Sequence, residues 1–225
     1  MKITFSIFVF FFAVTFSWSE NSSVNLSIKQ EIERSLDVGL KWLYQEQNST
    51  SGNWGLEEYP ALTGLAVRSF LGHPSQEIPK KYEKGLAKGL EFIRSKVQSD
   101  GGIYGKGLAS YNTSICMMAL MQAKNDKDDL VVKNARKFLV NQQSDFDRKG
   151  EVDNVFDGGV GYGSRWAHSD LSNTHLAMEA LFYAKKTSYS EFQPSTISHL
   201  GWVKKWNRVQ ICIYSQWASM PNLKY

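Results

Sequence analysis

The chain has 225 residues, and 26 Lys and Arg face 22 Asp and Glu, so its formal net charge is +4. This mild excess is spread along the chain beside acidic and aromatic residues, and no recognised nucleic-acid motif accompanies it. The charge therefore indicates solvated helix faces, and we expect no nucleic-acid partner. Behind a short leader, about two hundred residues are enough for one domain with a sizeable core.

The first segment, residues 1–19, has the pattern of a signal peptide. One early lysine precedes a short apolar run, and small residues at Ser17 and Ser19 make a cleavage site before Glu20. The run is shorter than the roughly twenty residues that a membrane span needs. We therefore predict export, to the outside or to a periplasm, with a retained N-terminal membrane anchor as the alternative. No later segment is apolar enough to be a transmembrane span.

The rest of the chain repeats one pattern three times and begins it a fourth time near 202–217. An apolar helical stretch with a large aromatic leads to glutamine, then to a polar turn, then to glycine and an aromatic. Such self-similarity predicts stacked supersecondary units. The markers are Trp42, Gln47, Gly52 and Trp54 in the first copy, Phe92, Gln98, Gly102 and Tyr104 in the second, and Phe138, Gln143, Gly159 and Tyr162 in the third.

Each copy predicts a helical hairpin. Apolar residues three or four apart predict first helices over 27–44, 81–97 and 130–143, and helices of smaller residues follow over 61–71, 110–123 and 170–184. Pro60 suits the first turn of a helix, and residues 73–79 read as a loop. The glutamines and aromatics at the joints are interpreted as mechanical clamps between units. The stretch 144–169 is the longest irregular segment.

These copies resemble the QW-type repeats of squalene cyclases and of prenyltransferase/squalene oxidase repeat proteins. The resemblance covers about residues 37–181 and, more weakly, 202–222. It implies an all-α fold, an α/α toroid in which inner helices line a central cavity. The chain holds three hairpins and part of a fourth, so we expect one domain over 27–222 that forms an open array. An open array has uncapped faces, which predicts a homodimer or a protein partner.

The catalytic residues of those families are mostly missing. Squalene–hopene cyclases use a DxDD motif, which the chain lacks, and Asp170 is the one candidate acid; it also suits the N-cap of its helix. Zinc-dependent prenyltransferases use an aspartate, a cysteine and a histidine, but Asn173 precedes Thr174 and His175 lies two positions later. We therefore expect no metal and no cofactor.

Polar residues recur at the starts of the second helices, where a toroid would gather them at one mouth of its cavity. Met117, Met118 and Met121 suit an adaptable apolar lining, although methionines at helical spacing equally suit a core. Cys116 and Cys212 are either a disulfide or buried small hydrophobes. The candidate ligand-binding residues are Tyr111, Asn112, His168, Asn173, His175, Tyr104 and Tyr162.

Three functional hypotheses follow from the resemblance and the residues. The first is a non-catalytic or divergent toroid protein that binds an apolar ligand, isoprenoid or lipid-like, or a protein partner on its concave face. The second is an active terpene cyclase or prenyltransferase that uses Asp170. The third is a carbohydrate-active (α/α) barrel, whose paired carboxylates would have to come from different units because Asp170 and Glu179 are about 13 Å apart along one helix.

Overall fold

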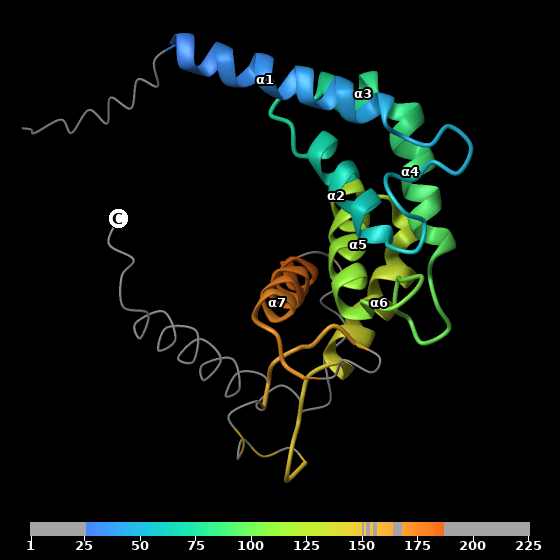
Figure 1. Ribbon diagram of the computed structural model, residues 1–225, viewed down its shortest axis with the longest axis vertical. Coiled ribbons are helices and arrows are strands. Elements are labelled where there is room, and N and C mark those ends of the chain that lie inside the picture. The colour runs from blue at the N-terminus through green and yellow to red at the C-terminus, as the bar shows by residue number, and fades with distance from the viewer. Residues whose placement is uncertain (1–25, 150, 152–153, 155–156, 164–167, 187–225) are drawn as a thin grey trace, which may run out of the picture. The chain divides into compact units, whose positions relative to one another are not determined.

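The computed structural model describes residues 26–149, 151, 154, 157–163 and 168–186, and within them the chain is all-α, as predicted (Figure 1). The chain divides into two compact units, Met1–Val38 and Gly39–Tyr225. The predicted signal peptide, the predicted fourth repeat and Cys212 lie outside the described residues.

Helix α1, Leu26–Gln45, crosses the boundary between the two units and agrees with the predicted helix over 27–44. Its part in the first unit is amphipathic, with Ile28, Ile32 and Leu36 three or four residues apart. Lys29 pairs with Glu33 at 4.0 Å, an exposed contact of a kind that contributes little to stability.

The second unit contains the last turns of α1 and all the later helices. The predicted helix over 81–97 is shorter, and the predicted loop over 73–79 is wrong in part, because it holds the short helix α3. Pro79 is tolerated there because it falls in the first turn, where its missing N–H is not needed. The helices are α2 Pro60–Leu71, α3 Glu77–Lys81, α4 Glu83–Ser95, α5 Ala109–Ala123, the 3-10 helix η1 Asp126–Asp128, α6 Asp129–Asn141 and α7 Leu171–Lys186.

The second helices of the predicted hairpins pack side by side, with α5 in contact with both α2 and α7 (Figure 1). The first helices pack onto this row: α4 contacts α2 and α5, and α6 contacts α5 and α7. Helices α4 and α6 therefore each pack between their own partner and the second helix of the preceding hairpin. This arrangement buries one stripe of α4 and of α6 and nearly the whole circumference of α5.

The centre of the core lies along α5. Met117, Met118 and Met121 are buried in the main apolar cluster. Their interpretation as a cavity lining is therefore wrong, and the alternative, that they belong to the core, is confirmed. Methionine suits this place because its flexible side chain fills irregular space between α5 and its four neighbours.

Candidate functional site

A threonine near the start of each second helix ties that helix to the turn before it. In all three copies its hydroxyl accepts a hydrogen bond from a buried backbone N–H of the turn. A buried donor without a partner would cost free energy, so these bonds stabilise the joint between turn and helix. The pairs are Trp54 N to Thr63 Oγ1 at 3.0 Å, Ile103 N to Thr113 Oγ1 at 2.9 Å and Val160 N to Thr174 Oγ1 at 2.9 Å.

These bonds correct the register of the repeat. Trp54 is equivalent to Ile103 and Val160, and all three side chains are buried. The predicted equivalents of Trp54, namely Tyr104 and Tyr162, are wrong, because both lie beyond the buried position and are only half-buried. The residue that closes the joint is therefore a buried apolar residue that need not be aromatic.

The side chains of the three glutamines donate to backbone carbonyls, and Gln98 does so from a position one residue later in its copy than Gln47 and Gln143. Gln47 Nε2 donates to Gly52 O and to Gly85 O of the next hairpin, both at 2.8 Å. Gln143 Nε2 donates to Gly158 O at 3.0 Å, in the place equivalent to Gly52. Gln98 lies one residue later in its copy and donates to Tyr104 O at 2.7 Å. The predicted clamping between units is therefore found for Gln47, whereas the bonds described for Gln143 and Gln98 stay within their own copies.

Two glycines bring the turns against the following hairpins. Gly52 has φ +78°, and a Cβ built on it would lie 2.7 Å from the Cβ of Lys88 on α4. Gly101 has φ +90°, and its Cβ would lie 2.8 Å from the carbonyl oxygen of Asn134 on α6. Lys88 and Asn134 are equivalent positions, so both joints require a residue without a side chain at this point of contact.

Asn112, a predicted ligand-binding residue, is fully buried and bonded within the fold. Its Oδ1 accepts a hydrogen bond from Ala61 N at 3.0 Å, and its Nδ2 donates to Leu108 O at 3.0 Å. It therefore caps the first turn of α2 from the neighbouring helix α5. The amide oxygen therefore joins two hairpins, and the amide nitrogen bonds to the start of its own helix.

Asp170 and Asn173 are the two candidate residues that the structure brings together. Asp170 Oδ1 accepts from Asn173 N at 2.8 Å and from Asn173 Nδ2 at 2.7 Å. The first bond is that of an N-cap, as the sequence predicts for Asp170. Asn173 is buried, and its Oδ1 has no hydrogen-bond partner. Both bonds hold the Asp170 carboxylate at the first turn of α7.

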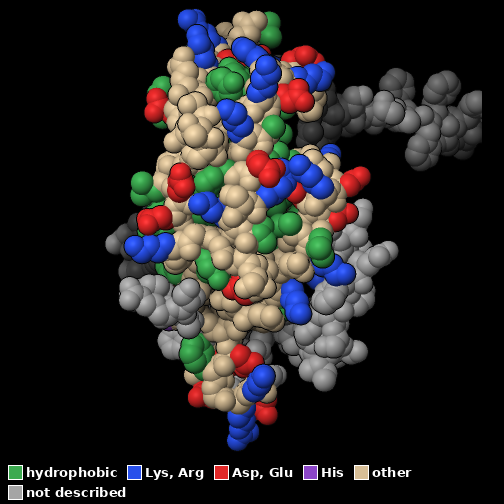
Figure 2. Space-filling model, turned by 90° about the vertical axis from the view of Figure 1, so that its right-hand side faces the viewer, with side chains coloured by type: hydrophobic (Ala, Val, Ile, Leu, Met, Phe, Trp, Pro, Cys, Tyr) green, Lys and Arg blue, Asp and Glu red, His purple; other side chains and the backbone are tan. Residues whose placement is uncertain are grey.

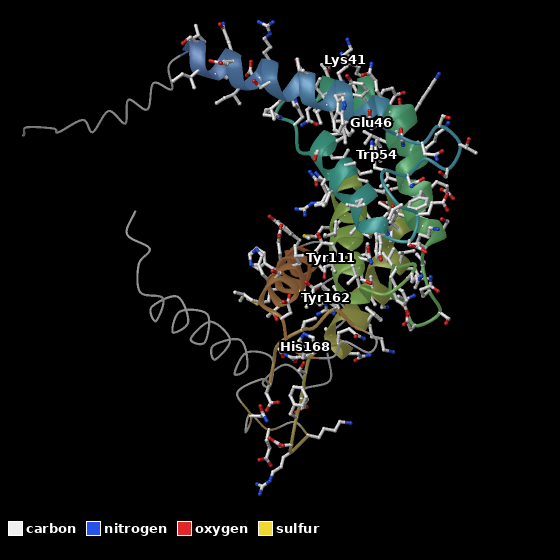
Figure 3. The ribbon with its side chains drawn as sticks, viewed as in Figure 1. Lys41, Glu46, Trp54, Tyr111, Tyr162 and His168 are labelled. Atoms are coloured by element: carbon white, nitrogen blue, oxygen red, sulfur yellow. The ribbon has the colours of Figure 1, made fainter. Side chains whose placement is uncertain are left out.

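The remaining candidates belong to different segments of the chain, and Figure 3 labels Tyr111, Tyr162 and His168 among them. Tyr104 donates its hydroxyl proton to Asp100 at 2.7 Å, and this bond, with some burial, raises the pKa of Tyr104 to about 12. Tyr162 belongs to the turn before α7, and its carbonyl accepts from Ser110 N at 3.1 Å. Tyr111 is half-buried, whereas His168 and His175 are exposed. In the part of the chain that the structure describes, no group of three His, Cys, Asp or Glu side chains is placed to hold a metal ion.

An ion pair that was not predicted joins the two outer members of the helix row. Arg68 on α2 reaches Glu179 on α7 with an Nη2–Oε1 distance of 3.1 Å, and both side chains are more than two-thirds buried. Met118 occupies the equivalent position of α5, which packs between α2 and α7. All three residues lie five positions after the equivalent threonine of their helix, and that shared offset is the signal by which the sequence could have placed them together.

A polar cavity of about 330 Å³ lies at the second joint, between the turn 98–101 and α6. Asn134, Lys137 and Asn141 contribute its α6 wall. At the first joint, Lys88 stands in the place of Asn134 and donates to Ser49 O at 2.7 Å, across the same kind of contact. The shorter asparagine does not reach as far, which is consistent with the open space between this turn and α6.

Cys116 is a free, fully buried thiol, and its burial raises its pKa above the usual range. A thiol in that state is a poor nucleophile and a poor metal ligand. On the face drawn in Figure 2, basic and acidic side chains are interspersed, without a continuous basic stripe. This distribution agrees with the expectation that charge serves solvation here.

None of the helices within the described ranges combines the length and the apolar character that crossing a bilayer requires. Comparison of the chain with family models, with curated proteins and with solved structures finds no match in any of the three.

Proposed function

We propose that this chain is an exported, non-catalytic helical-repeat scaffold of the α/α-toroid type, which binds a protein partner. The observation that carries the proposal is the use of the candidate polar residues within the fold. Asn112 caps α2, Asp170 caps α7, and the threonine of each second helix holds its turn. Side chains committed to such bonds are poor candidates for proton transfer, because catalysis needs a group that is free to reach a substrate.

The toroid arrangement is supported by the order of the contacts. Three second helices form one row, and α4 and α6 pack onto it between successive members. Repetition of such a joint with constant rotation closes a ring or leaves a curved array with two end faces. Repeat proteins commonly use extended surfaces of this kind to bind partners, which favours a scaffold over an enzyme.

Turnover assays test the non-catalytic part of the proposal. The purified chain would be incubated with squalene, and separately with prenyl diphosphates, with and without Zn²⁺, and products would be sought by mass spectrometry. We expect no product above a protein-free control. Product that disappears in an Asp170→Asn variant would overturn the proposal in favour of the cyclase hypothesis, since asparagine preserves the helix cap but cannot donate an acidic proton.

An apolar small ligand is the second candidate, and the exposed side of α7 favours it. Leu171 and Phe182 are both about half exposed, three turns apart on that helix. A lipid-like molecule would gain from covering them. Mass spectrometry of the organic extract of purified protein tests this: a stoichiometric lipid, lost in Phe182→Ser, would favour the ligand over the partner. For a carbohydrate-active enzyme, the ion-paired Glu179 offers no support.

A further inference from the structure

Equivalent positions in the three copies of the repeat can be compared directly. In the second and third copies a preceding second helix covers one side of the hairpin, and the structure describes no such helix before the first copy. Gly89 of α4 packs against the second helix of the preceding hairpin: its Cβ, if present, would lie 3.1 Å from Val67 and 3.5 Å from Thr63 of α2. Gly39 is the equivalent residue of α1, and no atom of the residues that the structure describes lies within 4 Å of the same point. Within the described part of the chain, the surface of α1 that matches the α2-binding surface of α4 is therefore open.

The same comparison holds for the second helices. Ile115 of α5 lies against Gly64 of α2 and is 1% exposed, whereas the equivalent Leu65 of α2 is 41% exposed. Asn112 and Leu62 are a second equivalent pair: Asn112 is fully buried where α5 meets α2, and Leu62 is 42% exposed. In the second and third copies, this side of the helix is covered by the preceding second helix. In the first copy it carries two leucines in contact with water.

Trp42 on α1 shows the same difference in exposure between the first copy and the others. Its equivalents, Phe92 and Phe138, are each 6% exposed, and Phe138 packs against Tyr104 of the preceding turn with ring centroids 5.9 Å apart. Trp42 itself is 59% exposed. We call the surface formed by Gly39, Trp42, Leu62 and Leu65 the end face. None of these four residues is charged, and exposed apolar side chains that gather on one surface can mark an interaction site.

We propose that the end face binds an amphipathic helix of a partner protein, in the position that α2 takes on the second hairpin and α5 takes on the third. The proposal rests on the scaffold role and specifies its partner. The residues of α2 that contact α4 and α5 indicate which residues the partner helix needs. It carries small residues along the edge that meets Leu62 and Leu65, as α2 carries Ala61 and Gly64, and a β-branched or larger apolar residue on the adjacent edge that meets Gly39, as α2 carries Val67. The end face continues an interface that the chain forms twice within itself.

A peptide with the sequence of residues 58–73 is the natural probe, because it contains α2. A short isolated helix is marginal in water, so the peptide would be stapled between the positions of Leu65 and Ser69, which lie four apart and outside the predicted contact. Binding of the fluorescent peptide to the full chain would be followed by anisotropy. We expect saturable binding that weakens at least tenfold with Leu65→Glu, and likewise with Gly39→Leu, which fills the open surface.

Two controls make the assay specific. Leu130→Glu, at an exposed leucine at the start of α6, is expected to leave the affinity unchanged. A peptide carrying Val67→Glu is expected not to bind. Circular dichroism would confirm that each protein variant is folded; Gly39→Leu is the safer variant, because it adds a good helix former where there is room.

Three results would overturn the proposal. One is the absence of saturable binding to the unsubstituted chain. Another is binding that neither Leu65→Glu nor Gly39→Leu changes, since the peptide would then be displacing α2 from its own place on α4 and α5. The third is a dimer in light scattering that Leu65→Glu dissociates, without peptide binding, which would assign the end face to a second copy. Turnover in the assays above would refute the scaffold role without altering any of these readouts.

Discussion

Arg94 and Asp128 join two successive first helices at the place where an aromatic pair joins the previous two. Arg94 on α4 donates to Asp128, with Nε–Oδ1 at 2.6 Å and Nη2–Oδ2 at 2.9 Å, and the Asp128 side chain is 1% exposed. The bond to Asp128 raises the pKa of Arg94. Counted from Gly89 and Ala135, the equivalent residues of the preceding joint are Tyr44 and Tyr82, whose ring centroids are 4.8 Å apart.

This buried ion pair is predicted to be the most sensitive polar contact between hairpins. Asp128→Ala would leave the Arg94 guanidinium without its bidentate partner in a largely buried place. Removal of one partner of a buried pair typically destabilises a protein by about 3–5 kcal/mol. We expect a loss of that order in the free energy of unfolding, measured by urea denaturation.

Glu91 provides the matched control, since it also contacts Arg94, at 3.2 Å, but is 71% exposed. Glu91→Ala is expected to change the free energy of unfolding by less than about 1 kcal/mol, as is usual for exposed pairs. Equal effects of the two substitutions would mean that burial does not distinguish these contacts.

The threonine bonds to the turns should be individually important. Thr113→Val keeps the shape of the side chain but leaves the buried N–H of Ile103 without an acceptor. A buried donor that loses its partner costs about 1–3 kcal/mol. We expect that loss in the free energy of unfolding, and a similar one for Thr63→Val. Thr50→Val, at an exposed threonine in the first turn, should remain within about 0.5 kcal/mol of the unsubstituted chain.

The helices could be predicted from the sequence, whereas the register of the joints could not. Apolar spacing and Pro60 placed α1 and α2 because these signals are local. The sequence pattern aligns the joints on the nearest aromatic after a glycine. Burial instead selects the second residue after the glycine with positive φ, which is Trp54 after Gly52 and Ile103 after Gly101. A backbone dihedral is not visible in a sequence that offers two adjacent glycines, Gly101 and Gly102.

The roles of the candidate site residues also could not be predicted from the sequence, because they depend on how the hairpins stack. Polar residues at helix starts suggested a cavity mouth, but the beginning of a helix is also where unpaired N–H groups need acceptors. Asn112 meets that need on a neighbouring helix, 51 residues away in the chain. A contact of that separation depends on how the hairpins stack. The three equivalent threonines were present in the sequence as a more regular signal than the aromatics.

Gly101 and Gly107 allow the backbone strain of a substituted glycine to be separated from the cost of a steric clash with a neighbouring helix. Both have positive φ, but a Cβ at Gly101 would meet the backbone of Asn134 at 2.8 Å, whereas nothing lies within 4 Å of one at Gly107. Gly107→Ala should therefore cost only the backbone strain of a left-handed residue, about 1–2 kcal/mol. Gly101→Ala should cost clearly more, because α6 must also move. Urea denaturation of the two variants measures the difference, and equal losses would contradict the close contact between the turn and α6.

Tyr104 should lose its phenolic proton at a higher pH than an ordinary tyrosine. Its hydrogen bond to Asp100 favours the neutral phenol and raises its pKa from 10.0 to about 12. Because the folded pKa lies above the unfolded one, the contribution of this group to stability is complete below about pH 10 and is lost as the pH rises towards about 12. The difference in tyrosinate absorbance between the unsubstituted chain and Tyr104→Phe isolates this group among the ten tyrosines. Asp100→Asn should move the midpoint of that difference titration to lower pH, since it removes the carboxylate that accepts the hydrogen bond from the phenol. An unchanged midpoint would show that the bond does not control the pKa of Tyr104.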